Sequence, residues 1–177
     1  MIALDTACKA LNAGDCDSAI VGGTNLVLSP GLSSVLSAYG VNSAEGRCRT
    51  FDAKASGYGR GEAVSSLYIK RLDHALRDGN PIRAVIRASM CNDDGKTPGI
   101  TQPSSAAHES LIRASYKAAG LAAKLHETAY FECHGTGTPT GDPIEASAVA
   151  RVFGKDGMII GSVGIPLNNA GMISQTT

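Results

Sequence analysis

The 177-residue sequence contains no tryptophan, few other aromatic residues and no excess of charge of either sign. Lysine and arginine together number 16, and so do aspartate and glutamate, with no block of basic residues. Proteins that bind nucleic acid or anionic membranes through electrostatics concentrate positive charge on one surface. We therefore expect neither nucleic acid nor a membrane as a partner.

Long apolar runs and a recognisable targeting segment are also missing. No apolar stretch approaches the roughly 18 residues that suggest a membrane-spanning helix. Met1 is followed at once by a helical pattern, without the basic start and apolar core of a signal peptide. We therefore expect a soluble protein of the cytoplasm. Hydrophobic residues make up 43% of the chain and charged residues 18%, a composition that supports an apolar core rather than disorder.

The cysteines lack the spacing of a metal or redox site. They number five and are scattered, and no two are separated by just two residues, as the ligands of a zinc site often are. The sequence thus predicts no metal centre. Because free cysteine is among the most buried residue types, we expect most of them to be small core residues. They are Cys8, Cys16, Cys48, Cys91 and Cys133.

Helical and strand patterns alternate along the chain, which favours a layered α/β fold over a bundle or a sandwich. Ser104 and Ser105 are candidate caps for one helix, and Gly14 follows another at the position of a stop signal. After Val163 the pattern loses its periodicity, so we separate a domain at 1–163 from a divergent tail at 164–177. The spacing predicts helices over 3–11, 105–119 and 143–153, a short buried strand over 18–22, and further strands over 64–72, 84–90, 129–132 and 158–161.

The densest signal is the segment Glu-Cys-His-Gly-Thr-Gly-Thr-Pro-Thr-Gly-Asp-Pro-Ile-Glu at 132–145. It places His134 directly after a predicted strand, on a loop of small residues. Glycines allow a ligand to approach the backbone closely, and Thr136 and Thr138 offer hydroxyl groups to the same space. A lone histidine is often structural. Here the conformational cost of alternating glycines favours a functional loop.

Two acidic residues at the end of this segment have two possible roles. Asp142 stands where a helix N-cap is expected, with Pro143 at the first helical position and Glu145 at the third. Capping and a direct part in the site are both compatible with this pattern. The glycine spacing does not match the G-x-G-x-x-G pattern of dinucleotide-binding proteins, so it gives no support to a nucleotide site.

The same segment resembles the histidine motif of β-ketoacyl synthases (ketosynthases) of polyketide and fatty-acid synthesis. Three further segments resemble other parts of that family, in the same order along the chain. The residues at 69–72 and 96–99 are most similar to those of fungal-type, multidomain iterative polyketide synthases. These segments are Ala-Ile-Val-Gly-Gly-Thr-Asn at 19–25, Arg-Thr-Phe-Asp-Ala-Lys-Ala-Ser-Gly-Tyr-Gly-Arg-Gly-Glu at 49–62, and Asn-Asp-Asp-Gly-Lys-Thr-Pro-Gly-Ile-Thr-Gln-Pro at 92–103.

The resemblance implies a thiolase-like fold of α/β/α/β/α layers, here incomplete: the end of the first half and most of the second. It also implies an acyltransferase that extends a cysteine-bound acyl group by decarboxylative Claisen condensation with a malonyl unit. His134 matches a catalytic histidine, Thr136 and Thr138 match residues along the pantetheine arm, and Asp142 and Glu145 match acidic residues that support the site.

Partners and cofactors follow from the same resemblance. The substrate is expected to arrive on the phosphopantetheine of an acyl carrier protein, with no cofactor bound by the domain itself. A neighbouring acyltransferase domain is the other expected partner, and the intact enzyme is expected to be a homodimer joined through a sheet edge. An incomplete fold of this kind leaves sheet edges and apolar faces exposed, which favours aggregation.

The Asp-Thr-Ala-Cys sequence at 5–8 resembles the family's nucleophile motif, yet we interpret Cys8 as a core residue of a helix. A nucleophilic cysteine belongs at a helix N-terminus, where the dipole lowers its pKa, and Cys8 lies about two turns in. Cys8 also precedes Gly22 by only 14 residues, closer than the family's nucleophile does. The family's lysine and second histidine do not follow Val163 either.

We therefore expect the nucleophile to lie before Met1 and the isolated chain to be inactive. Two alternatives remain open: a non-catalytic partner or binding module with the ketosynthase fold, and a β-ketoacyl synthase of the fatty-acid type.

Overall fold

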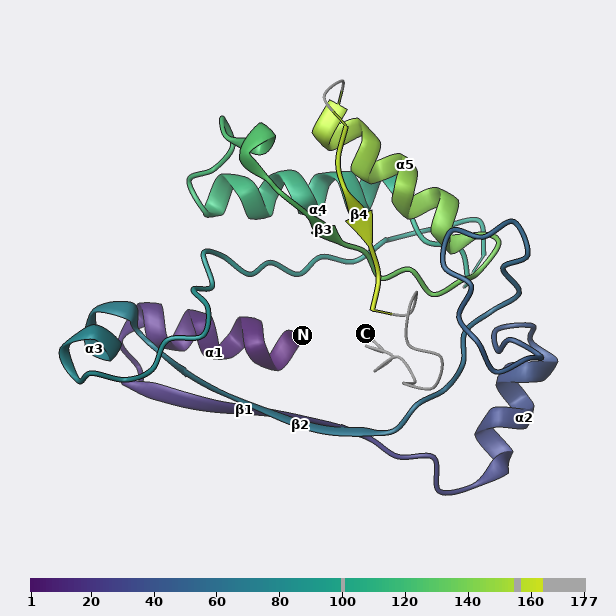
Figure 1. Cartoon of the computed structure of the whole chain (residues 1–177), viewed down its shortest axis with the longest axis horizontal. Helices are drawn as coiled ribbons and strands as arrows, with labels where there is room; N and C mark the ends of the chain where they lie inside the picture. Colours follow the sequence, from purple (N-terminus) through teal and green to yellow (C-terminus); the bar gives the residue numbers. More distant parts are fainter. Residues whose placement is uncertain (100, 155–156, 164–177) are drawn as a thin grey trace.

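The computed structural model describes residues 1–99, 101–154 and 157–163 (Figure 1). Helices and strands both occur along these residues, as the sequence predicts, but no described strand lies between residues 71 and 130. The elements are α1 (Ile2–Ala13), β1 (Ser18–Asn25), α2 (Pro30–Ala38), β2 (Ala63–Lys70), α3 (Leu72–Arg77), α4 (Ser105–Ala118), the short 3₁₀ helix η1 (Leu125–Glu127), β3 (Phe131–Glu132), α5 (Gly141–Phe153) and β4 (Ile160–Gly161). The predicted tail at 164–177 lies outside the described residues.

The described strands form two separate pairs. β1 and β2 run antiparallel over their whole length, from Ser18 opposite Lys70 to Asn25 opposite Ala63. β3 and β4 are short and parallel, and Cys133 just beyond β3 donates its N–H to the carbonyl of Gly161 at 2.7 Å. In Figure 1 the long β1–β2 ribbon runs along one side of the molecule, below α1, and β3 and β4 lie on the other side with α4 and α5.

The core lies where α5 packs against α4 and β3. Cys133, Val149, Val152 and Phe153 are buried there, and two further aromatic rings pack against Phe153. Its ring meets those of Tyr116 and Phe131 edge to face, with ring centroids 5.6 Å apart in both pairs. Edge-to-face pairs are favourable because the positive ring edge meets the negative ring face. This cluster fixes α5, and with it the loop that precedes α5.

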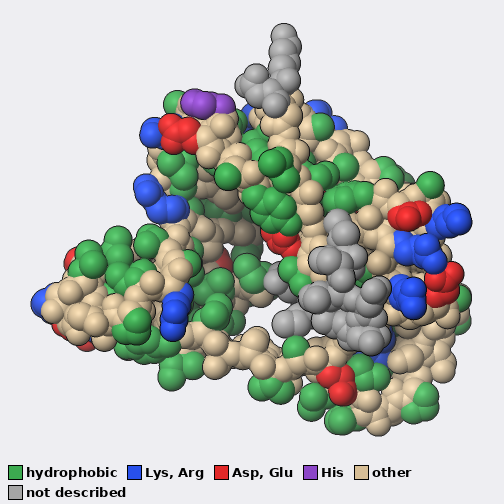
Figure 2. Space-filling view, viewed as in Figure 1, with side chains coloured by type: hydrophobic (Ala, Val, Ile, Leu, Met, Phe, Trp, Pro, Cys, Tyr) green, Lys and Arg blue, Asp and Glu red, His purple; other side chains and the backbone are tan. Residues whose placement is uncertain are grey.

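The β1–β2 ribbon, by contrast, leaves large apolar side chains in contact with solvent. Ile20 is 77% exposed and Val64 80% exposed, and apolar side chains also lie on the surface over α1 and α3 (Figure 2). The strand predicted at 18–22 is therefore real but longer than expected, and the expectation that it is buried is wrong. No helix or sheet among the described residues covers both faces of the ribbon.

Two other expectations about strands need correction. The strand predicted over 64–72 ends at Lys70, because Leu72 already belongs to α3. The strand predicted over 84–90 is not formed: the segment is extended, but its backbone makes no hydrogen bond to another described segment. Apolar alternation identifies a chain suited to a sheet, whereas a strand also needs a neighbour with which to pair.

The helices follow the sequence more closely. Ser104 caps α4 as predicted, since its hydroxyl accepts the N–H of Ala107 at 3.2 Å. The sequence reading missed α2, although Ser29 at the N-cap position and Pro30 at the first turn are standard start signals. None of the helices in the described part of the chain is long and apolar enough to cross a membrane.

Candidate active site

His134 lies on the loop that joins β3 to α5 and faces a cleft of about 500 Å³. Most of the residues that line it come from α4, from the segment before α4 and from the loop that carries His134. Its lining includes Tyr58, Asp94, Gln102, His108, Leu111, Ile112, Phe131, His134, Thr136, Thr138 and Glu145. Four of the five residues that the sequence assigned to a site, His134, Thr136, Thr138 and Glu145, therefore line one cleft.

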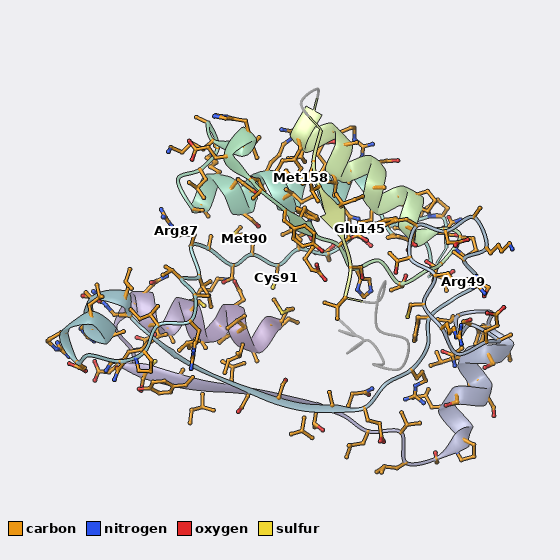
Figure 3. All side chains as sticks on the ribbon, in the orientation of Figure 1. Arg49, Arg87, Met90, Cys91, Glu145 and Met158 are labelled. Carbon is orange, nitrogen blue, oxygen red and sulfur yellow. The ribbon has the colours of Figure 1, made fainter. Side chains whose placement is uncertain are left out.

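Glu145 holds the backbone of the loop at the histidine. Its Oε1 accepts the N–H of His134 at 2.7 Å, and its Oε2 accepts the N–H of Gly135 at 2.9 Å. Glu145 reaches this position from the end of α5 that meets the loop (Figure 3). Hydrogen bonds to a charged acceptor are stronger than those between neutral groups. The carboxylate thus fixes two consecutive peptide units, and through them the direction in which His134 leaves the loop.

Asp142 does not line the cleft but connects the loop to a distant part of the chain. It is buried, with 3% of its surface exposed, and its two oxygens accept the N–H of Gly137 at 3.1 Å and of Phe51 at 2.8 Å. Phe51 has a φ of 59°, an uncommon value for a residue other than glycine. The hydrogen bond to Asp142 stabilises this backbone conformation.

These contacts exclude one of the two roles that the sequence left open for the acidic pair. α5 begins at Gly141, its N-cap residue is Thr140, and the side chain of Thr140 makes no capping hydrogen bond. Asp142 and Glu145 lie inside the first turns of α5 and bind backbone N–H groups of other segments. The capping-box interpretation is therefore wrong for both residues.

The alternation of glycine in the loop has a steric cause. Gly135 has a φ of 51°, and a Cβ added there would lie 2.5 Å from Cβ of Ser162. Gly137 has a φ of 73°, and its added Cβ would lie 2.7 Å from the backbone nitrogen of Arg49. Both positions therefore require glycine, because the neighbouring chain leaves no room for a side chain. The carbonyl of Gly137 accepts the N–H of Gly57 at 2.9 Å.

The two threonines of the loop lie next to each other at the cleft. Their Oγ1 atoms are 3.1 Å apart and form a hydrogen bond in which either hydroxyl group can be the donor. Thr138 Oγ1 also accepts the N–H of Gly141 at 3.1 Å, so this hydroxyl helps to begin α5. Thr136 has no such second contact among the described residues and is the more available of the two to a ligand.

The structure separates the five free cysteines by environment. Cys133, next to His134, is buried, and burial together with the nearby carboxylates of Glu145, Glu132 and Asp142 raises the pKa of its thiol to about 12. Cys91 is exposed on the extended segment before α4 (Figure 3), whereas Cys8, Cys16 and Cys48 are half-buried. The expectation that most of them are buried therefore holds only for Cys133.

Cys8 is the seventh residue of α1, about two turns from the start of that helix. Asp5 of the same segment is buried and accepts hydrogen bonds from Ser89 at 2.9 Å and from Lys9 at 2.7 Å. This part of the apparent nucleophile motif therefore attaches α1 to the chain near Ser89. The helical position that the sequence predicts for Cys8 agrees with the structure.

Sequence reasoning missed several residues that build the site. Thr50 and Ser162 contact the carbonyl of Gly135, and Phe51 binds Asp142. His108 on α4 lines the cleft, and only its spacing from Leu111 and Ile112 could have indicated this. Among the described residues, no group of three histidine, cysteine or acidic side chains is placed to hold a metal ion.

Profiles of known families match nearly the whole chain. The profile of the β-ketoacyl synthase N-terminal domain matches residues 1–75, and that of the β-ketoacyl synthase C-terminal domain matches residues 83–172. The chain therefore belongs to the β-ketoacyl synthase family, which confirms the resemblance found in the sequence.

Individual relatives narrow the comparison to polyketide synthases. The chain is 59% identical over 163 residues to the highly reducing polyketide synthase sphB of Aspergillus fumigatus and 56% identical to the highly reducing polyketide synthase VdtX of Byssochlamys spectabilis. Each match covers 92% of this chain, and the chain spans only 6% and 7% of the length of these relatives.

Solved structures confirm the fold class. The ketosynthase from module 6 of the bacillaene synthase of Bacillus subtilis 168 superposes with a TM-score of 0.85 and 39% identity, over 89% of this chain and 29% of that one. The oxazolomycin ketosynthase domain OzmH KS7 of Streptomyces albus gives a TM-score of 0.86 and 36% identity, over 93% and 29%. The chain thus has part of the thiolase-like α/β fold of ketosynthases.

The environments of the cysteines predict their reactivity. A thiol with a pKa of about 12 stays protonated at pH 8, and the thiolate is the nucleophile in alkylation. Brief treatment of the folded chain with iodoacetamide at pH 8 should therefore label Cys91 and leave Cys133 unlabelled, as peptide mass spectrometry would show. Labelling in denaturant supplies the control, in which both cysteines should react. Rapid labelling of Cys133 in the folded chain would contradict its burial.

Proposed function

We propose that this chain is the histidine-bearing part of a ketosynthase that performs decarboxylative Claisen condensation in polyketide biosynthesis. One observation carries the proposal: His134 stands at an open cleft on a loop whose backbone is fixed at both sides by carboxylates of α5. A group that must meet a reacting atom needs this kind of preorganisation. Membership of the β-ketoacyl synthase family supports the same reaction.

In the proposed reaction, the bond between the malonyl carboxylate and the adjacent carbon breaks and CO₂ leaves. The resulting enolate carbon attacks the carbonyl of an acyl group held as a thioester on a cysteine, and that cysteine leaves as a thiolate. His134 donates a hydrogen bond to the thioester oxygen on which negative charge develops. Thr136 and Thr138 hold the pantetheine arm that delivers the malonyl unit, and Glu145 and Asp142 keep the loop in place. We assign the nucleophile's role to a cysteine other than Cys8.

The partners follow from the reaction. An acyl carrier protein delivers the malonyl unit on its phosphopantetheine, an acyltransferase domain loads it, and this domain itself binds no cofactor. Cytoplasmic location and the division of the chain at residue 163 remain predictions from the sequence. The names of the relatives, highly reducing polyketide synthases, favour polyketide over fatty-acid synthesis.

The decisive experiment transfers the site into a complete enzyme. Residues 1–163 replace the matching segment of the bacillaene module 6 ketosynthase, and release of CO₂ from a malonyl thioester is measured together with the condensation product. We expect an active graft. His134→Ala should lower kcat by about 100-fold or more, because removal of one oxyanion donor has an effect of that size.

Two variants serve as controls in the same graft. His126 is exposed on η1, outside the cleft, so His126→Ala should leave the rate unchanged. Cys8→Ser should also leave it unchanged, since we place the nucleophile elsewhere. A His134→Ala graft as active as its parent would refute the proposed role of His134, and a folded graft without any activity would favour a non-catalytic module.

We also propose that two copies of the chain join through the free edge of β1. Among the described residues β1 pairs only with β2, so its other edge offers unpaired backbone groups, and Ile20 on this strand is 77% exposed. Exposed apolar strands of this kind pair readily with another chain. Ile20→Lys and, separately, a proline in place of Val21 should lower the dimer fraction measured by sedimentation, whereas Leu76→Lys on α3 should not. A chain that is monomeric at all concentrations would contradict this proposal.

A further inference from the structure

His108 is one of the polar side chains of the cleft that have no role in the reaction as described above. His108 is the fourth residue of α4, is half-buried and lines the cleft together with His134 and the two threonines. Leu111 and Ile112, three and four residues further along α4, line the same cleft. Residues at this spacing share one face of a helix. His108 thus belongs to the face of α4 that lines the cleft.

Several other polar side chains of α4 are engaged within the protein. Ser105 donates to the carbonyl of Ile144 at 3.1 Å, Glu109 pairs with Arg151 at 2.7 Å, and Ser115 donates to the carbonyl of Leu111 at 2.9 Å. The imidazole of His108, by contrast, makes no hydrogen bond or ion pair with any described residue. A half-buried polar group without a partner loses free energy unless a ligand or water supplies the contact.

The charge of the cleft indicates what such a ligand is like. Among the described residues that line it, the charged groups are the carboxylates of Asp94 and Glu145, and no lysine or arginine is present. A phosphate group would therefore enter against negative charge. Hydroxyl, amide and imidazole groups on an apolar wall of Leu111, Ile112 and Phe131 suit a neutral chain that carries amides.

We propose that His108 binds the amide-bearing, uncharged part of the pantetheine arm and thereby positions the thioester for His134. This inference rests on the proposed function and adds a residue to it. Thr136 and His108 then hold the arm from two sides of the cleft, one from the loop before α5 and one from α4. His108 is a positioning residue for the substrate, and the phosphate of the arm stays outside the cleft.

The test is a titration of the 177-residue chain with D-pantetheine, followed by NMR shifts of its backbone amides. The wild-type chain should show shifts at residues of the cleft. His108→Ala should weaken binding about three- to tenfold, which corresponds to the loss of one hydrogen bond. His108→Gln, which restores a donor and an acceptor at this position, should recover most of the affinity. His126→Ala is the matched control and should bind as the wild type does.

Three results would overturn the inference. They are wild-type affinity in His108→Ala, failure of glutamine to restore what alanine removes, and shifts at the cleft with inorganic phosphate as strong as those with pantetheine. Amide spectra of each variant reveal any loss of the fold. Because the titration involves no reaction, its outcome is independent of the graft experiment. Loss of catalysis in the graft with intact pantetheine binding would refute the proposed reaction alone, and the reverse outcome would refute only the role of His108.

Discussion

The site depends on hydrogen bonds from backbone N–H groups to two carboxylates at the start of α5. Glu145 accepts from His134 and Gly135, and Asp142 accepts from Gly137 and Phe51. A loop of glycines and small residues has many accessible conformations and little means to choose one by itself. Each hydrogen bond to a charged acceptor contributes on the order of 1.5–3 kcal/mol, which is enough to select one conformation locally.

The carboxylates can act in this way because α5 is itself fixed. Val149, Val152 and Phe153 further along the helix are buried in the core with Cys133. Packing therefore sets the position of the helix, the helix sets the carboxylates, and the carboxylates set the loop. The same chain of dependence explains why two segments far apart in the sequence, around 49–59 and 134–138, meet at the site. Asp142 binds both, and Gly137 has no room for a side chain because Arg49 lies against it.

The sequence allowed prediction of what depends on local signals. The start of α4 at its serine cap and the placement of His134 after a strand agree with the structure, because caps, glycines and apolar spacing act over a few residues. The predictions that failed concern features that depend on partners distant in the sequence. The segment 84–90 has the composition of a strand but no described neighbour to pair with, and the ribbon residue Ile20 is exposed because nothing described covers it.

The acidic pair shows the same limit. The segment Asp142-Pro143-Ile144-Glu145 has the local pattern of a capped helix. Only the fold reveals that Phe51, 91 residues before Asp142, donates its backbone N–H to the carboxylate of Asp142. His108 was overlooked for a similar reason. A histidine near a helix start has no local mark of function, and its place at the cleft becomes visible only when α4 and the loop before α5 are brought together.

Hydrogen exchange of the loop amides tests the central claim most directly. In Glu145→Ala the amides of His134 and Gly135 should exchange at least tenfold faster than in the wild type, consistent with the loss of hydrogen bonds of the size given above. The amide of Val149 in the same helix should keep its protection, and Glu127→Ala, an exposed change outside the site, should leave all three amides unaffected. Unchanged exchange at His134 and Gly135 in Glu145→Ala would show that the loop does not depend on this carboxylate.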